Sequence, residues 1–165
     1  ALDYVGKGFE ERRIFLPQLL MSAEAAKAAF NVIRDKMAAE GGSQSNGIKV
    51  ILATVKGDIH DIGKNIVKVL FENYGYQVID LGKDVPPEKI AETAVQNNVS
   101  VVGLSALMTT TVGAMEETIK ALRAAGNFKI IVGGAVLTQD YAGSIGADCY
   151  APNAVSAVNY ANSLQ

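Results

Sequence analysis

The single histidine of the chain, His60, lies in a segment that could bind a metal ion. Asp58 lies two residues before it, and on an extended segment its carboxylate can reach the ring nitrogen that does not bind metal. Such a hydrogen bond fixes the tautomer of a histidine ligand and makes the ligand more basic. A loop histidine beside aspartates is also often a plain surface residue. Gly63 favours the ligand interpretation, because glycine permits a tight turn or the close approach of a bulky group.

Two further segments carry residues that could contact a ligand. Four hydroxyl side chains precede a helical run, and these are Ser105, Thr109, Thr110 and Thr111. We expect Thr110 or Thr111 to cap that helix, but one cap needs only one hydroxyl. The remaining hydroxyls could donate to oxygen or nitrogen atoms of a ligand. The pair Gly133 and Gly134 either forms a plain turn or leaves the edge of a sheet open to a ligand.

From residue 49 onward, short β-rich runs alternate with helical runs. The predicted strands are 49–55, 77–81, 99–104, 129–132 and 147–150. The predicted helices are 63–74, 87–97, 112–125, 138–145 and 154–163. Parallel strands need crossover connections, so this alternation predicts a parallel sheet with helices on both faces. Five such units predict an α/β fold of the flavodoxin-like (Rossmann-like) kind with a five-stranded parallel sheet.

In such a sheet, ligands bind beyond the carboxyl ends of the strands, near the point where the strand order reverses. The segments around His60, Ser105 and Gly133 each follow a predicted strand. The fold therefore predicts that these three segments meet at one edge of the sheet. The segment 82–86 is predicted to be a further strand-to-helix loop at that edge.

The first part of the chain differs in composition from the rest. Residues 40–47 are rich in Gly, Ser and Asn, which bury little and leave the backbone free, so they predict a linker and hinge. We expect one domain over residues 1–45, containing a partial helical cap and the linker, and an α/β domain over residues 46–165. Pro17 can begin a helix. Apolar residues then recur at helical spacing, at Leu19, Leu20, Ala23, Ala26, Phe30, Ile33 and Met37.

The composition excludes some classes of function. Lys and Arg total 15 against 17 for Asp and Glu, so a net charge of −2 supplies no basic field for nucleic acid. The sequence shows no apolar run of roughly 18 residues that would predict a membrane span, and no signal-peptide pattern at its start. We therefore expect a cytoplasmic protein without nucleic-acid or membrane partners. The single cysteine, Cys149, cannot form an internal disulfide.

Together these motifs resemble a known family. Residues 58–63, Asp-Ile-His-Asp-Ile-Gly, match the Asp-x-His-x-x-Gly signature of cobalamin domains that bind their cofactor base-off and His-on. Ser105-Ala106-Leu107 resembles the Ser-x-Leu motif of that family, and the Gly133-Gly134 pair follows in the family's order. From Lys49 to Gln165 the chain thus resembles the cobalamin (B12)-binding domain of the methionine synthase and methyltransferase corrinoid protein family. Residues 15–20, Phe-Leu-Pro-Gln-Leu-Leu, are similar to the end of that family's helical cap.

The resemblance implies roles for particular residues. It makes His60 the lower axial ligand of cobalt, with Asp58 hydrogen-bonded to it and Thr111 extending the link, and these three form the expected catalytic set. Further expected cofactor contacts are Asp61, Ile62, Gly63, Ser105, Leu107, Thr109, Gly133 and Gly134, with Ser105 and Thr109 meeting the displaced nucleotide. Candidates for covering the upper face of the corrin are Phe15, Leu16 and Leu19.

The resemblance also implies a function. The chain would carry a methyl group on cobalamin or a related corrinoid, passing between cob(I)alamin and methylcobalamin. Its partners would be a methyl-donor:corrinoid methyltransferase and a methyl-acceptor methyltransferase linked to tetrahydrofolate, homocysteine or a thiol, with a reductive activase as a further candidate. We do not expect the chain to turn over alone. The alternatives are the small cobalamin-binding subunit of a radical mutase, which would use adenosylcobalamin, and a cobalamin-dependent sensor.

Overall fold

The computed structural model describes residues 47–164 without a gap and, before them, residues 8, 11, 13–15, 17, 18, 21, 22, 25, 28, 29, 32, 33 and 36. The chain divides into two units, Ala1–Gly42 and Ser43–Gln165. In the first unit the described residues between Pro17 and Lys36 are helical, in agreement with the apolar spacing there. The predicted hinge at 41–47 lies outside the described residues except for Gly47.

Residues 47–164 form a five-stranded parallel sheet with the strand order β2-β1-β3-β4-β5. The strands are β1 (Lys49–Val55), β2 (Gln77–Val85), β3 (Val101–Ser105), β4 (Lys129–Gly133) and β5 (Cys149–Tyr150). The order reverses at β1, so the switch point lies between the carboxyl ends of β1 and β3. The flavodoxin-like prediction is confirmed.

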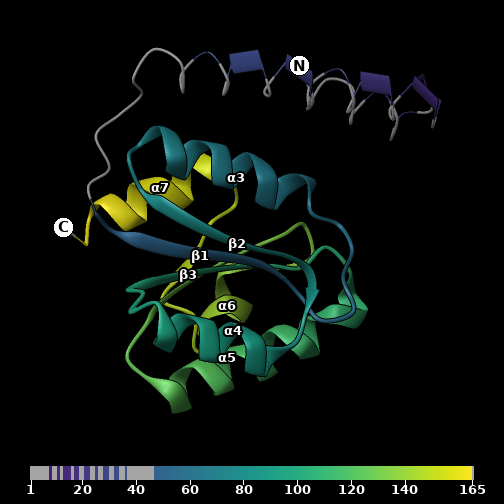
Figure 1. Cartoon of the computed structure of the whole chain (residues 1–165). Helices are drawn as coiled ribbons and strands as arrows, with labels where there is room; N and C mark the ends of the chain where they lie inside the picture. Colours follow the sequence, from purple (N-terminus) through teal and green to yellow (C-terminus); the bar gives the residue numbers. More distant parts are fainter. Residues whose placement is uncertain are drawn as a thin grey trace. The chain divides into compact units, whose positions relative to one another are not determined.

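Helices cover both faces of this sheet. They are α3 (Ile62–Asn73), α4 (Pro87–Gln96), α5 (Val112–Ala125), α6 (Gln139–Ser144) and α7 (Ala154–Asn162), and the short 3-10 helix η1 (Thr109–Thr111) precedes α5. Figure 1 shows α3 and α7 on one face and α4, α5 and α6 on the other. None of the helices in the described part of the chain is long and apolar enough to span a membrane.

One strand is longer than predicted. We expected β2 to end at residue 81, but it continues along β1 to Val85, which pairs with Val55. The pairing shifts register on the way, and Gly82 and Asp84 have φ values of 84° and 54°. A strand that continues through two left-handed residues gives no regular alternation in the sequence. The predicted loop 82–86 is therefore wrong in its first four residues.

The side chains of the sheet divide between two core clusters, because successive residues of a strand point to opposite faces. One cluster joins the sheet to α4, α5 and α6 and includes Ile51, Val102, Ile130, Ile90, Met115, Ile119 and Leu122. The other joins the sheet to α3 and α7 and includes Val50, Leu52, Val101, Ile131, Phe71, Ala157 and Val158. The second cluster borders the cavity described below.

Candidate functional site

The loop after β1 places a buried carboxylate next to His60. Asp58 is fully buried, although the residues on both sides of it are exposed. Its Oδ1 accepts hydrogen bonds from the backbone N–H of His60 at 2.9 Å and from the ring Nδ1 of His60 at 2.8 Å. The spacing of two residues therefore brings the carboxylate to the imidazole ring.

The other oxygen of Asp58 bonds to the loop after β3. Asp58 Oδ2 accepts from the backbone N–H groups of Leu107 at 2.6 Å and Met108 at 3.3 Å, and from the hydroxyl of Thr111 at 2.9 Å. The two loops belong to the strands that flank the switch point. A single carboxylate thus joins both sides of the place where this fold binds ligands.

These contacts keep Asp58 ionised and fix the tautomer of the His60 ring. Burial by itself raises the pKa of Asp58, but the hydrogen bonds from the amides of His60 and Leu107, the His60 ring and the Thr111 hydroxyl outweigh it. They hold the pKa of Asp58 far below its usual range. An ionised carboxylate only accepts, so Nδ1 of His60 carries the proton. In the neutral ring this leaves the lone pair on Nε2, the form in which histidine binds a metal.

Thr111 does not cap a helix. It is the residue before α5, yet its hydroxyl makes no capping bond and contacts Asp58 and, at 2.8 Å, the carbonyl oxygen of Met108. Thr110 does not cap the helix either, because η1 and α5 lack a side-chain cap. The prediction that one of these threonines caps the helix is wrong, because the Thr111 hydroxyl donates its hydrogen bond to the buried carboxylate of Asp58.

The surface around His60 is apolar. The imidazole side chain is 44% exposed, and Ile59 and Ile62 beside it are 62% and 60% exposed. Leu107 and Met108, whose amides bond Asp58, are also exposed large hydrophobic residues. An exposed apolar rim around one polar ring is typical of a ligand-binding surface.

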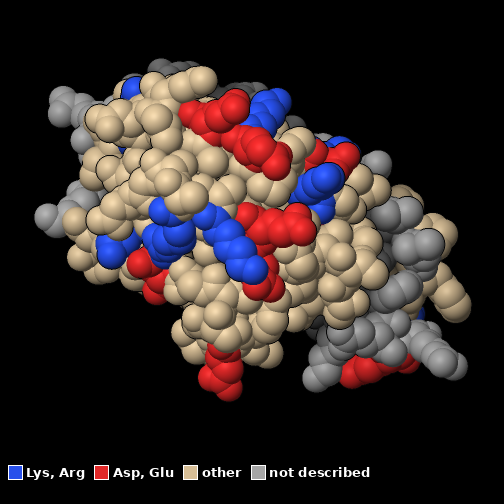
Figure 2. All heavy atoms as spheres, turned by 90° about the horizontal axis from the view of Figure 1, so that it is seen from below, with Lys and Arg blue, Asp and Glu red and all other residues tan. Residues whose placement is uncertain are grey.

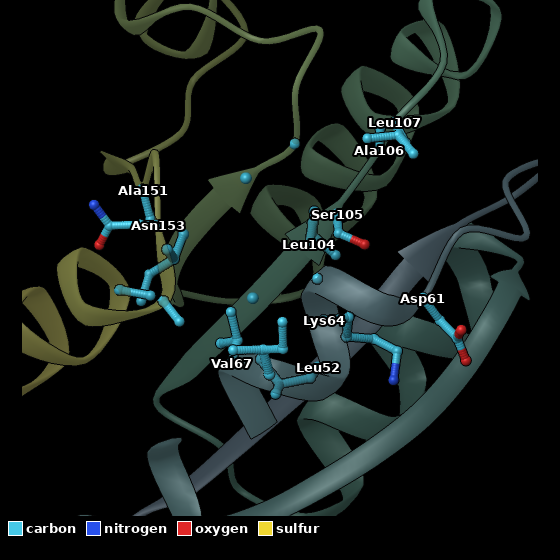
Figure 3. Close-up of a pocket in the computed structure, with 18 of the residues that line it drawn as sticks. Leu52, Asp61, Lys64, Val67, Leu104, Ser105, Ala106, Leu107, Ala151 and Asn153 are labelled. Atoms are coloured by element: carbon cyan, nitrogen blue, oxygen red, sulfur yellow. The ribbon is translucent and has the colours of Figure 1, made fainter. Parts of the chain in front are cut away.

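A cavity of about 670 Å³ opens beside His60, between α3, α7 and the sheet. The predicted site residues that line it are His60, Asp61, Ile62, Gly63, Ser105, Leu107, Gly133 and Gly134. Figure 3 shows Asp61 and Lys64 at the start of α3, Ser105 and Leu107 at the end of β3, and Ala151 and Asn153 before α7. The three predicted segments therefore meet at one edge of the sheet.

Other predicted residues lie away from the cavity lining. Asp58 and Thr111 are buried and hold His60 from beside the cavity, and Thr109 is exposed. Phe15, in the first unit, is 69% exposed. Leu16 and Leu19 lie outside the described residues. The contacts expected of Thr109, Phe15, Leu16 and Leu19 with a cofactor stay predictions.

The glycines at the mouth of the cavity act in different ways. Gly63 lies inside α3, and a Cβ built on it would meet nothing within 4 Å, so it leaves open space and makes no tight turn. At Gly134, with φ 139°, a Cβ would lie 1.7 Å from the carbonyl oxygen of Ala106. Glycine is required there because the chain after β4 passes directly against the chain after β3. A Cβ on Gly133 would lie 3.1 Å from the Ala151 carbonyl oxygen.

The inner part of the cavity is apolar. Leu52, Gly103 and Ile131 form one row across β1, β3 and β4 and line its floor. A Cβ on Gly103 would lie 2.6 Å from Cδ2 of Leu52. Because position 103 has no side chain, the Leu52 side chain can lie over it and does not extend into the cavity. Val67, Phe71 and Ala157 from the helices complete this part. These residues look like ordinary core positions in the sequence, so nothing in it marks them as part of a site.

A buried lysine at the start of α3 was also missed. The Nζ atom of Lys64 lies 2.6 Å from Asp80 Oδ1 on β2 and 2.7 Å from Asn65 Oδ1. Lys68 lies 3.3 Å from the other oxygen of Asp80. Burial alone would raise the pKa of Asp80, but these lysines and the amide of Gly82 lower it. The charge pair holds the first turn of α3 against β2.

Charges elsewhere are mixed in sign. Figure 2, which views the side of α4 and α5, shows Lys and Arg side chains interleaved with Asp and Glu. Lys120 and Glu116, for example, form an ion pair at 2.8 Å along α5. Among the described residues, no group of three or more His, Cys, Asp or Glu side chains could enclose a metal ion.

Comparison with known proteins assigns the family. A family model described as a B12 binding domain matches residues 48–159. The chain belongs to the B12-binding domain family. A second model of a B12 binding domain matches residues 1–34.

Relatives of this B12-binding protein match it along nearly its whole length. Dimethylamine corrinoid protein 3 of Methanosarcina mazei is 42% identical over 166 residues, which cover 99% of each chain. The structure of the Methanosarcina barkeri monomethylamine corrinoid protein is 32% identical with a TM-score of 0.81, over 99% of this chain and 78% of that one. A chain of the methanol:cobalamin methyltransferase complex from Methanosarcina barkeri is 31% identical with a TM-score of 0.70. The match covers 99% of this chain and 62% of that one.

These matches confirm the resemblance to cobalamin-binding corrinoid proteins, and the cofactor of this B12-binding domain is a corrinoid. The residues fit that cofactor. His60 offers one nitrogen donor at an apolar, half-exposed surface, and an apolar cavity bordered by glycines opens beside it. A nitrogen ligand next to a deep apolar cavity suits a metal macrocycle that carries a bulky side arm.

Proposed function

We propose that the chain is the corrinoid protein of a methyltransferase system and holds cobalamin base-off and His-on, with His60 as the lower axial ligand. The observation that carries this proposal is the buried Asp58 carboxylate, which fixes the His60 ring from one side and the loop after β3 from the other. A bound corrinoid supplies a cobalt that takes up a methyl group and gives it away.

The residues of the loop have distinct tasks in this proposal. His60 presents Nε2, and Asp58 orients the ring through Nδ1. Thr111 donates to Asp58 and so limits how far the carboxylate can follow the ring. Gly63 leaves room for the nucleotide arm at the cavity, and Gly134 lets the chains after β3 and β4 pass close together beside it.

The names of the relatives support a methyltransferase system that uses a methylamine or methanol as the methyl donor. They are corrinoid proteins for dimethylamine and monomethylamine, and one solved complex is a methanol:cobalamin methyltransferase. We therefore propose that the partner delivering the methyl group is a methyltransferase specific for a methylamine or methanol, in preference to a methionine synthase arrangement. A second methyltransferase, linked to tetrahydrofolate, homocysteine or another thiol, would receive the methyl group.

The proposed domains are residues 1–45, a partial helical cap with its linker, and residues 46–165, the cobalamin-binding part. A family model that matches residues 1–34 separately supports this division. In this arrangement Phe15, Leu16 and Leu19 would cover the upper face of the corrin, where the methyl group resides. Covering residues of this kind keep water from the reacting atoms.

Replacement of His60 by alanine tests the proposal. We expect His60→Ala to fold normally, because the ring is half-exposed, and to shift bound methylcobalamin to a base-off visible spectrum. Added imidazole should restore the His-on spectrum, since it supplies the missing nitrogen ligand. An unchanged spectrum in the variant would remove His60 from the proposed site.

A further inference from the structure

Asp84 has a backbone conformation that ordinary residues avoid. Within residues 47–164, Asp84 and Asn98 are the only residues other than glycine with a positive φ, at 54° and 53°. Asp and Asn adopt this conformation more readily than alanine does. Asp84 lies near the end of β2, just where that strand runs on irregularly beside β1.

Asp84 holds the loop that carries His60. Its Oδ1 accepts a hydrogen bond from the backbone N–H of Gly57 at 2.7 Å. Its own backbone N–H donates to the carbonyl oxygen of Asp58 at 3.0 Å. The two bonds hold the peptide groups on either side of the Gly57–Asp58 link, Lys56–Gly57 through its N–H and Asp58–Ile59 through its carbonyl oxygen. Gly57 has a φ of 82° and lies in a sharp turn, and the two hydrogen bonds from Asp84 fix this turn in place.

The loop is therefore fixed by two strands. The side chain of Asp58 bonds to the loop after β3, and the main chain of Gly57 and Asp58 bonds to the end of β2. Without the bond from Asp84, Asp58 could still contact His60, but the pair could shift together. A displacement of about 1 Å matters for a metal ligand, since site geometry must hold within about 0.5 Å.

We propose that Asp84 is a positioning residue that sets His60 for coordination of the corrinoid metal through the main chain of Gly57 and Asp58. The required property is the acceptor oxygen at Oδ1, and the negative charge is dispensable. This inference rests on the proposed function, because it gives Asp84 no role unless His60 is the axial ligand.

A double-mutant cycle on the full chain tests it. The measurement is the Kd for methylcobalamin of the wild type, Asp84→Ala, His60→Ala and the double variant. Asp84→Asn keeps an acceptor oxygen and the backbone conformation. Asn98→Ala is the matched control. It places alanine at nearly the same φ, but before the amino end of β3 and not near the carboxyl end of β2.

We expect Asp84→Ala to raise the Kd about fivefold, the change that losing one hydrogen bond of about 1 kcal/mol produces. In the His60→Ala background the same substitution should change the Kd by less than about twofold, since no ligand remains to be positioned. Asp84→Asn and Asn98→Ala should bind like the wild type. Amide hydrogen exchange of Gly57 should rise in Asp84→Ala and stay unchanged in Asn98→Ala.

Equal weakening in both backgrounds would show a merely structural role and overturn the inference. So would an Asp84→Asn variant as weak as Asp84→Ala, or a Gly57 exchange rate that Asp84→Ala leaves unchanged. These outcomes leave the His60 proposal intact if His60→Ala still shifts the spectrum. A His60→Ala variant with the spectrum and Kd of the wild type would overturn both proposals together.

Discussion

Asp58 concentrates five hydrogen-bond donors on one carboxylate in a fully buried position. A buried charge is stable only when hydrogen bonds replace its lost hydration. The spacing of Asp58 and His60 was sufficient to predict their mutual contact. The amides of Leu107 and Met108 could not be predicted, because backbone groups look alike in every sequence and only the tertiary fold brings them near.

Asp58→Asn should destabilise the protein in a pH-dependent way. At pH 7 we expect a loss of about 3 kcal/mol in the free energy of unfolding, because the new NH₂ group would face the donors of Leu107 and Thr111. The folded pKa of Asp58 lies below its unfolded value, so its stabilising contribution is present near neutrality and lost in acid. The difference between variant and wild type should therefore shrink by about 1.4 kcal/mol per pH unit below about pH 3.9.

Urea unfolding at pH 7 and pH 3 measures this difference. Asp140→Asn is the control, because Asp140 is an exposed residue in the first turn of α6 and should give a small effect at both pH values. A difference between Asp58→Asn and the wild type that is as large at pH 3 as at pH 7 would contradict the ionised, hydrogen-bonded carboxylate.

At the scale of the elements, the order and type of the strands and α-helices between residues 49 and 164 followed from the alternation of β-rich and helical runs, whereas the short helix η1 was not predicted. A further exception is the end of β2, where Gly82 and Asp84 interrupt the alternation. Because position 84 looked like loop, the contact of Asp84 with Gly57 was missed. The floor of the cavity was missed for the opposite reason, since Leu52 and Ile131 are regular strand residues and nothing local marks the space that Gly103 leaves between them.

Gly103→Ala tests whether the space between α3, α7 and the sheet receives the nucleotide arm. The new methyl group should push Leu52 into the cavity, so we expect weaker binding of cobalamin by roughly tenfold, the cost of about 1.4 kcal/mol that overpacking can reach. Cobinamide, which lacks the nucleotide, should bind as it does to the wild type. Both affinities can be measured by spectrophotometric titration.

Gly113→Ala in α5 provides the control, because a Cβ there meets nothing within 4 Å and the residue does not line the cavity. It should leave both affinities unchanged. Equal weakening of cobalamin and cobinamide by Gly103→Ala would mean that the nucleotide arm lies elsewhere.

At the scale of the whole molecule, the Gly- and Ser-rich stretch at residues 40–47 predicts a division into two domains, and this stays a prediction. The two core clusters draw all their described members from residues 48–161. The α/β part therefore contains the apolar contacts that a domain needs to fold alone. The helical cap and its contact with a cofactor stay predictions.

A fragment of residues 43–165 should consequently unfold cooperatively. We expect its Tm to lie within about 4 °C of the full chain, the shift that about 1 kcal/mol causes in a domain of this size. It should also give the same His-on spectrum with methylcobalamin, since His60, Asp58 and Thr111 all lie within it. Circular dichroism and visible spectroscopy check both points, and a fragment without a cooperative transition would contradict the proposed domain boundary.

The cavity between α3 and α7 is bordered by members of the core itself, namely Leu52, Phe71, Ile131, Ala151 and Ala157. A nucleotide arm that enters it packs against side chains that also hold the helices on the sheet. Any ligand that binds only the native state stabilises it in proportion to the logarithm of its concentration. Proteases in the cell act on the unfolded fraction, so the amount of this protein would rise and fall with the supply of the vitamin.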